Sequence, residues 1–121
     1  MPSTGPDATP VAVGILENAR HRILVAQRPV HQHQGGKWEF PGGKMHAGEA
    51  ARDALARELH EELGITLRDA CPMQRVRHVY PDRSVLLDVW RVMDYTGEPH
   101  GREGQPLRWV TPQELTGLDL P

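Results

Sequence analysis

Three glutamates in the middle of the chain have residue types and a spacing suited to holding a cation. Glu58, Glu61 and Glu62 lie in the run 50–63, whose alanines and leucines favour a helix that ends at Gly64. On that helix the three carboxylates form a stripe beside the apolar arc. Like charges three and four residues apart repel, and acids near the C-terminal end oppose the helix dipole, so each effect costs a few tenths of a kcal/mol. A bound divalent cation would remove both penalties.

A solvated acidic face is the ordinary explanation for a glutamate-rich helix, so the neighbouring residues decide. Arg57 can partly neutralise Glu61 from four positions away, but Glu58 and Glu62 have no Lys or Arg partner at helical spacing. A double glycine just upstream allows a close backbone approach, and the carbonyl of Gly42 could supply a further oxygen ligand. Mg²⁺ suits this partial set, because it takes few protein oxygens and completes its coordination with waters and substrate phosphates.

Hydrophobic patterning and turn residues indicate the elements that must position these groups. We expect short strands at 9–16, 22–28, 37–40, 74–80, 85–93 and 107–110. The segment 29–36 is expected to be a loop, and Pro41-Gly42-Gly43 a turn that stops the third strand. Thr111 and Pro112 predict a final helix, as its N-cap and its first residue. In the long helix, the residues expected to face the core are Leu55, Leu59 and Leu63.

Length and composition indicate one ordinary globular domain. With 121 residues and a formal charge of -2, the chain suits a single domain at 9–121 after a flexible leader at 1–8. Neither a nucleic-acid polymer nor a membrane is implied as a partner, since no apolar run reaches the ~20 residues of a membrane helix. A cytoplasmic, monomeric protein is expected. The one cysteine, Cys71, is expected to be a small packing residue and not a catalytic thiol.

The spacing around the acidic helix resembles the Nudix box at every fixed position. In order, the box is Gly43, five residues, Glu49, seven residues, Arg57-Glu58-Leu59, one residue, Glu61-Glu62, one residue and Gly64-Ile65. Seven fixed residues at fixed spacing arise by chance on the order of once in 10⁸ windows, so the motif is specific. The stretch 37–105 is also similar to the MutT branch, the 8-oxo-dGTP pyrophosphohydrolases. The segments that carry this similarity are Trp38-Glu39-Phe40-Pro41-Gly42-Gly43-Lys44, Tyr80-Pro81-Asp82-Arg83, Gly97-Glu98-Pro99 and Glu103-Gly104-Gln105.

This resemblance implies a fold of the α/β class, the Nudix fold, an α/β/α sandwich with a mixed central β-sheet. It also implies an Mg²⁺-dependent hydrolase, with Mn²⁺ as an alternative ion, in which water attacks a phosphorus of a nucleoside triphosphate. The expected reaction converts 8-oxo-dGTP to 8-oxo-dGMP and pyrophosphate, which keeps mutagenic precursors out of DNA replication. The implied metal ligands are the Gly42 carbonyl, Glu58, Glu61, Glu62 and Glu103.

The resemblance assigns further roles around the metal. Glu58 is the first choice for general base, and Glu103 is the alternative, since metal ligation and proton removal make opposed demands on one carboxylate. Gly43, Glu49 and Arg57 are expected to support the site structurally, with Glu49 and Arg57 pairing to fix the loop onto the helix.

The resemblance also implies a set of nucleotide-binding residues, which are Arg28, His33, Glu39, Phe40, Lys44, Asp82 and Arg83. Arg28 suits a phosphate or a base-edge acceptor, and Phe40 could pack on the sugar or base. Without the family, Phe40 would more often be a core residue and Arg83 an ordinary turn residue. A solvated side chain is the alternative for Lys44.

The substrate has alternatives that the sequence leaves open. At constant spacing, the asparagine with which MutT enzymes recognise the oxidised purine would fall just after Pro121. We expect either a shortened chain or a longer natural protein, for example one fused to a thiamine-phosphate-synthase-like domain. The alternative activities are hydrolysis of an ordinary dNTP or of another nucleoside diphosphate derivative. A Nudix fold that only binds its ligand is disfavoured, because a binding module need not keep carboxylates that weaken its helix.

Overall fold

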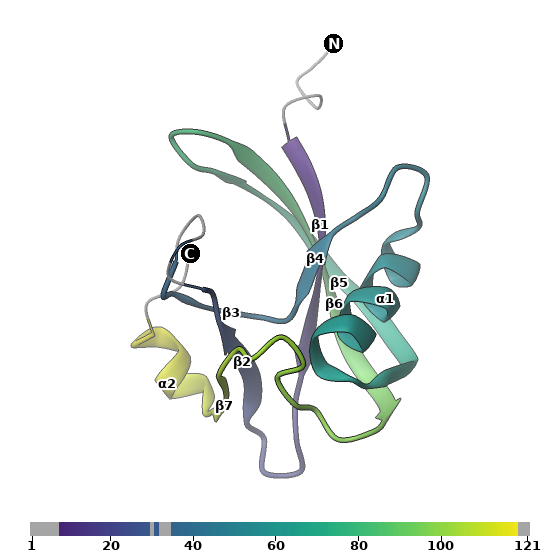
Figure 1. Ribbon diagram of the computed structural model, residues 1–121, viewed down its shortest axis with the longest axis vertical. Helices are drawn as coiled ribbons and strands as arrows, with labels where there is room; N and C mark the ends of the chain where they lie inside the picture. The colour runs from purple at the N-terminus through teal and green to yellow at the C-terminus, as the bar shows by residue number, and fades with distance from the viewer. Residues whose placement is uncertain (1–7, 30, 32–34, 119–121) are drawn as a thin grey trace.

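A mixed four-stranded sheet forms the centre of the protein (Figure 1). The computed structural model describes residues 8–29, 31 and 35–118. The sheet has the order β4-β1-β6-β5, built from β1 (Ala8–Leu16), β4 (Gly42–Lys44), β5 (Thr66–Val79) and β6 (Ser84–Thr96). Strand β1 runs antiparallel to β4 and parallel to β6, while β5 and β6 form an antiparallel hairpin. The expected α/β class with a mixed central sheet is therefore confirmed.

The remaining strands form a smaller antiparallel sheet of order β3-β2-β7. Its members are β2 (Ile23–Gln27), β3 (Trp38–Glu39) and β7 (Leu107–Val110), and α2 (Pro112–Thr116) follows directly. The predicted start of α2 is confirmed as a capping box. The Thr111 hydroxyl accepts from the Glu114 backbone N–H at 3.1 Å, and the Glu114 carboxylate accepts from the Thr111 N–H at 2.8 Å.

Helix α1 (Ala51–Leu63) packs on the central sheet through the leucine arc that the sequence predicts. Leu55, Leu59 and Leu63 are fully buried, and they join a core that also contains residues of β1 and β6. Gly64 ends the helix with a φ of 71°, and its N–H donates to the His60 carbonyl. Burial of the leucines fixes the rotation of α1, and Glu58 and Glu62 on the neighbouring arc then lie against Gly43 and Gly42 of β4.

Three local expectations differ from the structure. Residues 42–44 form strand β4 instead of a turn, because they pair with β1 at Val13↔Gly42. Strand β5 begins at Thr66 and not at residue 74, and its nearly continuous exposure, its bulges and Pro72 hid it from hydrophobic patterning. Cys71 is exposed on that strand, so its expected role as a packing residue is wrong.

Within the described residues, no helix is both long and apolar enough to span a bilayer.

Candidate active site

The double glycine of β4 brings the chain against both β1 and the acidic helix. Gly42 has a φ of 150°, and a Cβ there would collide with the backbone carbonyl of Ala12 on β1. A Cβ on Gly43 would lie 2.6 Å from both carboxylate oxygens of Glu58. Glycine at position 43 therefore allows the Glu58 carboxylate to lie here, in the volume that a side chain on residue 43 would occupy.

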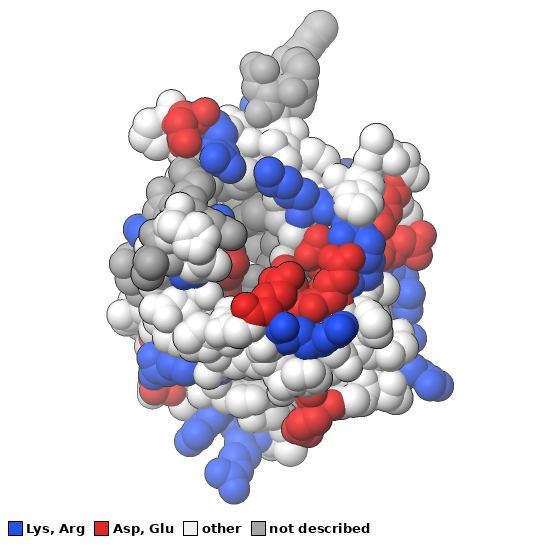
Figure 2. Space-filling model, viewed as in Figure 1, with Lys and Arg blue, Asp and Glu red and all other residues white. Residues whose placement is uncertain are grey.

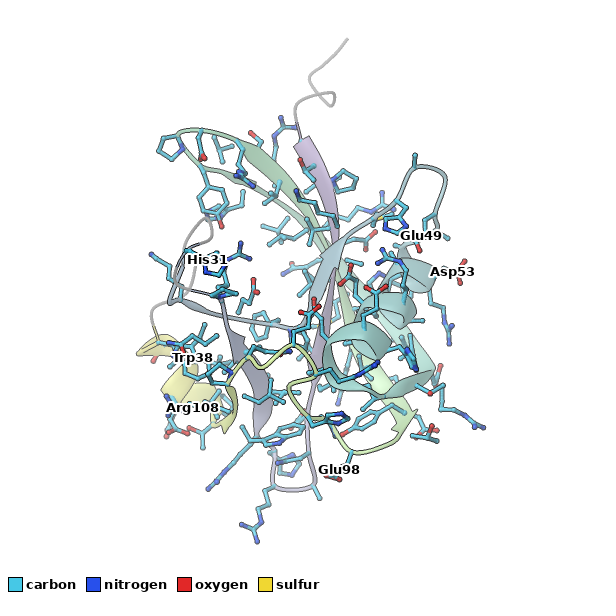
Figure 3. The ribbon with its side chains drawn as sticks, viewed as in Figure 1. His31, Trp38, Glu49, Asp53, Glu98 and Arg108 are labelled. Carbon is cyan, nitrogen blue, oxygen red and sulfur yellow. The ribbon has the colours of Figure 1, made fainter. Side chains whose placement is uncertain are left out.

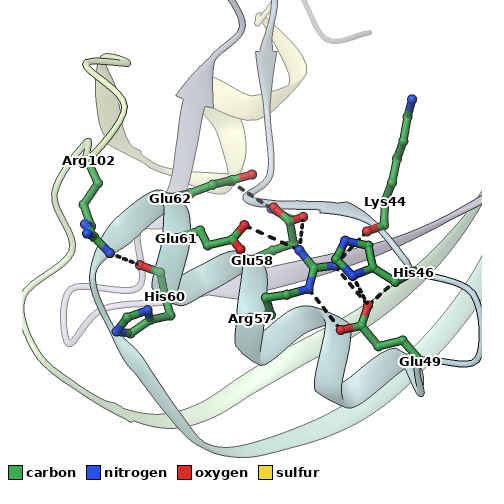
Figure 4. A network of polar contacts seen from close by, with 10 residues as sticks. Lys44, His46, Glu49, Arg57, Glu58, His60, Glu61, Glu62 and Arg102 are labelled. Carbon is green, nitrogen blue, oxygen red and sulfur yellow. Dashed lines mark hydrogen bonds and ion pairs between the residues drawn. The ribbon is translucent and has the colours of Figure 1, made fainter.

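Arg57 ties the segment before α1 to the glutamates of the helix (Figure 4). Its guanidinium donates twice to Glu49, from Nε and Nη2, both at 3.0 Å, and Nη2 also reaches the Lys44 carbonyl at 3.0 Å. Nη1 donates to Glu58 at 2.8 Å and to Glu61 at 3.4 Å. The family pair of Glu49 and Arg57 is present, and Glu58 has a cationic partner that helical spacing did not indicate, its sequence neighbour Arg57.

This bidentate contact changes the titration of Glu49. The two hydrogen bonds from Arg57 and a third from the His46 backbone N–H lower the pKa of Glu49 to about 2. The same pairing, with Glu49 first and Glu58 second, raises the pKa of Arg57 further above its ordinary value. Both groups stay charged at neutral pH, so the contact fixes the segment at 44–49 onto the helix.

The pKa of Glu62 is shifted in the opposite direction from that of Glu49. Its carboxylate accepts a long hydrogen bond from the Gly42 N–H at 3.4 Å. Burial first, and then the adjacent Glu58 carboxyl, raise the pKa of Glu62 to about 9. Two carboxylates this close cannot both carry a charge comfortably unless a cation lies between or beside them. The pair is therefore a chemically suitable, partial set of oxygen donors for a divalent metal.

The arrangement of the acidic side chains also provides only some of the ligands that a metal ion needs. Among the residues that the structure describes, no group of three or more His, Cys, Asp or Glu side chains is arranged to hold a metal ion by itself. Glu61 is directed to Arg57, and Glu103 approaches from the loop between β6 and β7. This suits a metal that relies on a few protein oxygens together with waters and phosphates, and it does not suit a closed all-protein cage.

A cavity of about 760 Å³ opens beside these carboxylates. Figure 2 shows acidic side chains gathered at the edge of a hollow, with Lys and Arg side chains next to them. Glu62 and Glu103 line this cavity, whereas Glu58 and Glu61 are not among its lining residues. Such a volume is in the range typical of sites for nucleotide-sized ligands.

Most of the residues expected to bind the nucleotide meet at this cavity, although they come from distant parts of the chain. Those that line it are Arg28, Glu39, Phe40, Lys44 and Arg83. Asp82 is not among the lining residues, and its carboxylate lies 3.7 Å from the Arg83 guanidinium. His33 lies outside the described residues. The structure thus brings together five of the seven expected positions.

The lining of the cavity contains an internal ion pair. Arg28 donates to Glu39 at 2.8 Å. Burial raises the pKa of Glu39, and the hydrogen bond from Arg28 acts against that rise. The pair offers a donor and an acceptor side by side, which suits recognition of a polar base edge or a phosphate.

Several lining residues were not anticipated from the sequence, among them Gln27, His31, His78, Tyr80 and Gln105. The His78 and Tyr80 rings are 4.4 Å apart and tilted by 51°. Their spacing of two residues on a strand was the available signal, because such residues share one face of a sheet. Figure 3 places His31 on the side of the molecule away from Glu49.

Comparisons with known proteins agree with this geometry. The family model described as NUDIX domain matches residues 12–121. An 8-oxo-dGTP diphosphatase from Escherichia coli is 40% identical over 111 residues, which cover 92% of this chain and 86% of that protein. A CTP pyrophosphohydrolase from the same organism is 41% identical over 105 residues, covering 83% and 78%.

The solved structures agree as well. A MutT structure from work on Aliivibrio salmonicida and Vibrio cholerae superposes with a TM-score of 0.79 at 37% identity, covering 94% of this chain and 88% of that one. Motif, fold and overall similarity therefore converge. The chain belongs to the Nudix hydrolase family of enzymes, in its MutT or 8-oxo-dGTP diphosphatase branch.

Proposed function

We propose that this enzyme hydrolyses 8-oxo-dGTP to 8-oxo-dGMP and pyrophosphate with the help of Mg²⁺. The observation that carries the proposal is the crowded pair of Glu58 and Glu62 at the edge of a nucleotide-sized cavity. Because the pKa of Glu62 is raised to about 9, its ionised form is unfavourable at neutral pH in the free protein. A bound divalent ion makes the ionised form favourable. The proposal includes a cytoplasmic, monomeric enzyme that acts on free nucleotides.

The residues proposed to hold the ion are Glu58, Glu61, Glu62, Glu103 and the Gly42 carbonyl. When bound, Mg²⁺ or Mn²⁺ neutralises charge on the triphosphate and makes a coordinated water more acidic. The water oxygen forms a bond to phosphorus, the phosphoanhydride P–O bond between the α- and β-phosphorus atoms breaks, and the water proton passes to a carboxylate. Arg28 and Lys44 line the cavity and are proposed to contact the nucleotide, with phosphate as the partner of Lys44.

Two carboxylates are candidates for the proton acceptor. Glu103 lines the cavity, whereas Glu58 lies behind Gly43 and is engaged by Arg57 at 2.8 Å. A base must lie within reach of the water that it deprotonates. This supports Glu103 as the base and Glu58 as a metal ligand, which reverses the preference from the sequence.

A pyrimidine triphosphate is the second candidate substrate. It is favoured by the CTP pyrophosphohydrolase from Escherichia coli, whose identity of 41% equals that of the 8-oxo-dGTP diphosphatase within one percentage point. The segments shared with the MutT branch favour the oxidised purine. Initial rates of pyrophosphate release from 8-oxo-dGTP, dGTP, CTP and dCTP at equal concentrations separate the two. A kcat/KM for CTP above that for 8-oxo-dGTP would reject the oxidised purine as the preferred substrate.

The catalytic proposal is tested with a matched pair of variants. Glu62→Gln removes one charge from the proposed metal site. Glu98→Gln makes the same change on the exposed loop after β6, at a residue that is not among those lining the cavity and that lies apart from His31 (Figure 3). We expect Glu62→Gln to lower kcat by ~100-fold or more and Glu98→Gln to leave it unchanged. Full activity of Glu62→Gln would contradict the metal-ligand role.

A further inference from the structure

The side chain of Gln105 connects the backbones of two glutamates that line the cavity. Its Oε1 accepts from the Glu103 N–H at 2.9 Å, and its Nε2 donates to the Glu62 carbonyl at 2.9 Å. Both ends of one planar amide are therefore used, and Gln105 itself is half-buried at the wall of the cavity. The spacing between the two backbones is set by the length of a single glutamine side chain.

The loop that carries Glu103 has other attachments to the end of α1. The Arg102 N–H donates to the Glu62 carbonyl at 3.0 Å, the Arg102 guanidinium donates to the His60 carbonyl at 2.9 Å, and the His100 N–H donates to the Leu63 carbonyl at 3.1 Å. These bonds occupy carbonyls of the last helical turn, where the Glu62 and Leu63 carbonyls have no partners within the helix and the His60 carbonyl also accepts from the Gly64 N–H. They hold the loop on the helix without help from Gln105.

Gln105 differs from these anchors because it reaches Glu103 itself. Glu103 lies in a tight turn in which the Gly104 N–H donates to the Gly101 carbonyl at 3.0 Å. Among the described residues, no side chain pairs with the Glu103 carboxylate, so its direction depends on how its backbone is held. The bond from the Glu103 N–H to Gln105 fixes that backbone relative to Glu62.

We propose that Gln105 is a positioning residue for hydrolysis, which holds Glu103 at a fixed distance from Glu62. The proposal rests on the proposed function of these two glutamates. A contact that orients a catalytic or ligating carboxylate changes the rate of the chemical step more than the affinity for substrate, and its loss commonly lowers activity by ~10- to 100-fold. Gln105 touches neither carboxylate in this arrangement, because it acts through the two backbones.

Two variants separate the two hydrogen bonds of the Gln105 side chain. Gln105→Leu removes both hydrogen bonds at similar size, whereas Gln105→Glu keeps the acceptor for the Glu103 N–H and loses the donor to Glu62. The control is Gln113→Leu, the same change on an exposed position of α2. We expect Gln105→Leu to lower kcat by ~10- to 100-fold with KM changed by less than ~3-fold, and Gln105→Glu to retain an intermediate kcat. Gln113→Leu should match the original protein.

Hydrogen exchange supplies a readout that does not depend on turnover. The Glu103 amide should exchange at least ~10-fold faster in Gln105→Leu than in Gln105→Glu, since only the second variant retains its acceptor. Equal exchange in the two variants, or an unchanged kcat in Gln105→Leu, would overturn the positioning role. Glu62→Gln and Glu103→Gln are assayed in parallel. If both remain fully active, the proposed function fails, whereas their inactivity beside a normal Gln105→Leu rejects only the role of Gln105.

Discussion

The carboxylate of Glu58 occupies the space that a side chain on Gly43 would fill, with both of its oxygens 2.6 Å from the position of such a Cβ. Gly43 is not among the glycines with a positive φ, so an alanine there is free of backbone strain. Glycine at this position therefore serves the placement of one carboxylate. This close fit adds to the hydrogen bonds that join strand β4 to helix α1, from the Gly42 N–H to Glu62 and from Arg57 to the Lys44 carbonyl.

Gly43→Ala should separate activity from stability. The atoms in the way are the far end of a flexible side chain, so Glu58 can move aside, and we expect stability to fall by about 1 kcal/mol or less. The displaced carboxylate should lower kcat/KM by ~10- to 100-fold. Gly117→Ala is the control, because its φ is -96° and the nearest atom to a Cβ is 3.7 Å away. Thermal unfolding and steady-state kinetics measure both effects, and an active Gly43→Ala would contradict the stated role of the contact.

Glu62 predicts a pH dependence of stability in metal-free protein. Its pKa is raised from 4.5 to about 9, so between these values the folded state binds more protons than the unfolded state. The free energy of unfolding should therefore lose this contribution as pH rises through the window. Denaturant unfolding at about pH 5 and about pH 8 measures it, and Glu62→Gln should flatten this part of the profile.

Adding Mg²⁺ should counter that loss, because an ion that binds the ionised carboxylates stabilises only the folded state. We expect the rise in melting temperature on Mg²⁺ addition to be larger at about pH 8 than at about pH 5, and to shrink in Glu62→Gln. A rise of the same size in the variant would contradict metal binding at Glu62.

Glu49 predicts the opposite behaviour in acid. Its pKa is lowered from 4.5 to about 2, chiefly by the hydrogen bonds from Arg57, so it contributes stability above pH 4.5 that is lost as pH falls toward 2. Glu49→Gln should remove this acid-dependent contribution. Because Arg57 also donates to Glu58, the variant should lower kcat by roughly 10-fold as well. Acid denaturation curves that coincide for the two proteins would contradict the assignment.

Arg28→Lys tests the ion pair in the lining of the cavity. Lysine keeps the charge but loses the guanidinium geometry that bonds Glu39 at 2.8 Å, so we expect KM for the nucleotide to rise by ~10-fold with a smaller change in kcat. Arg20→Lys is the matched control, since Arg20 is exposed on the turn before β2 and is not among the lining residues. Equal KM values for the two variants would argue against a substrate contact at Arg28.

Local sequence determined the parts of this protein whose signals lie close together in the chain. The leucine spacing in α1, the αL glycine at position 64 and the capping box at Thr111 each depend on residues within four positions of one another. The box from Gly43 to Ile65 likewise identified the family and its acidic helix. Such patterns can be recognised in the sequence because the geometry of helices and turns is set by residues that are close together in the chain.

Only the tertiary structure decided two kinds of contact: those between segments that are far apart in the chain, and those between helical residues whose side chains point in different directions on a helical wheel. Adjacent helical residues do not face each other, and the contact of Arg57 with Glu58 exists because Glu49 and the Lys44 carbonyl draw the guanidinium across the helix. The hydrogen bond from the Gln105 side chain to the Glu62 carbonyl joins residues that are 43 positions apart in the chain. These distances follow from how the sheet, the helix and the loop pack together, and no periodicity in the chain records them.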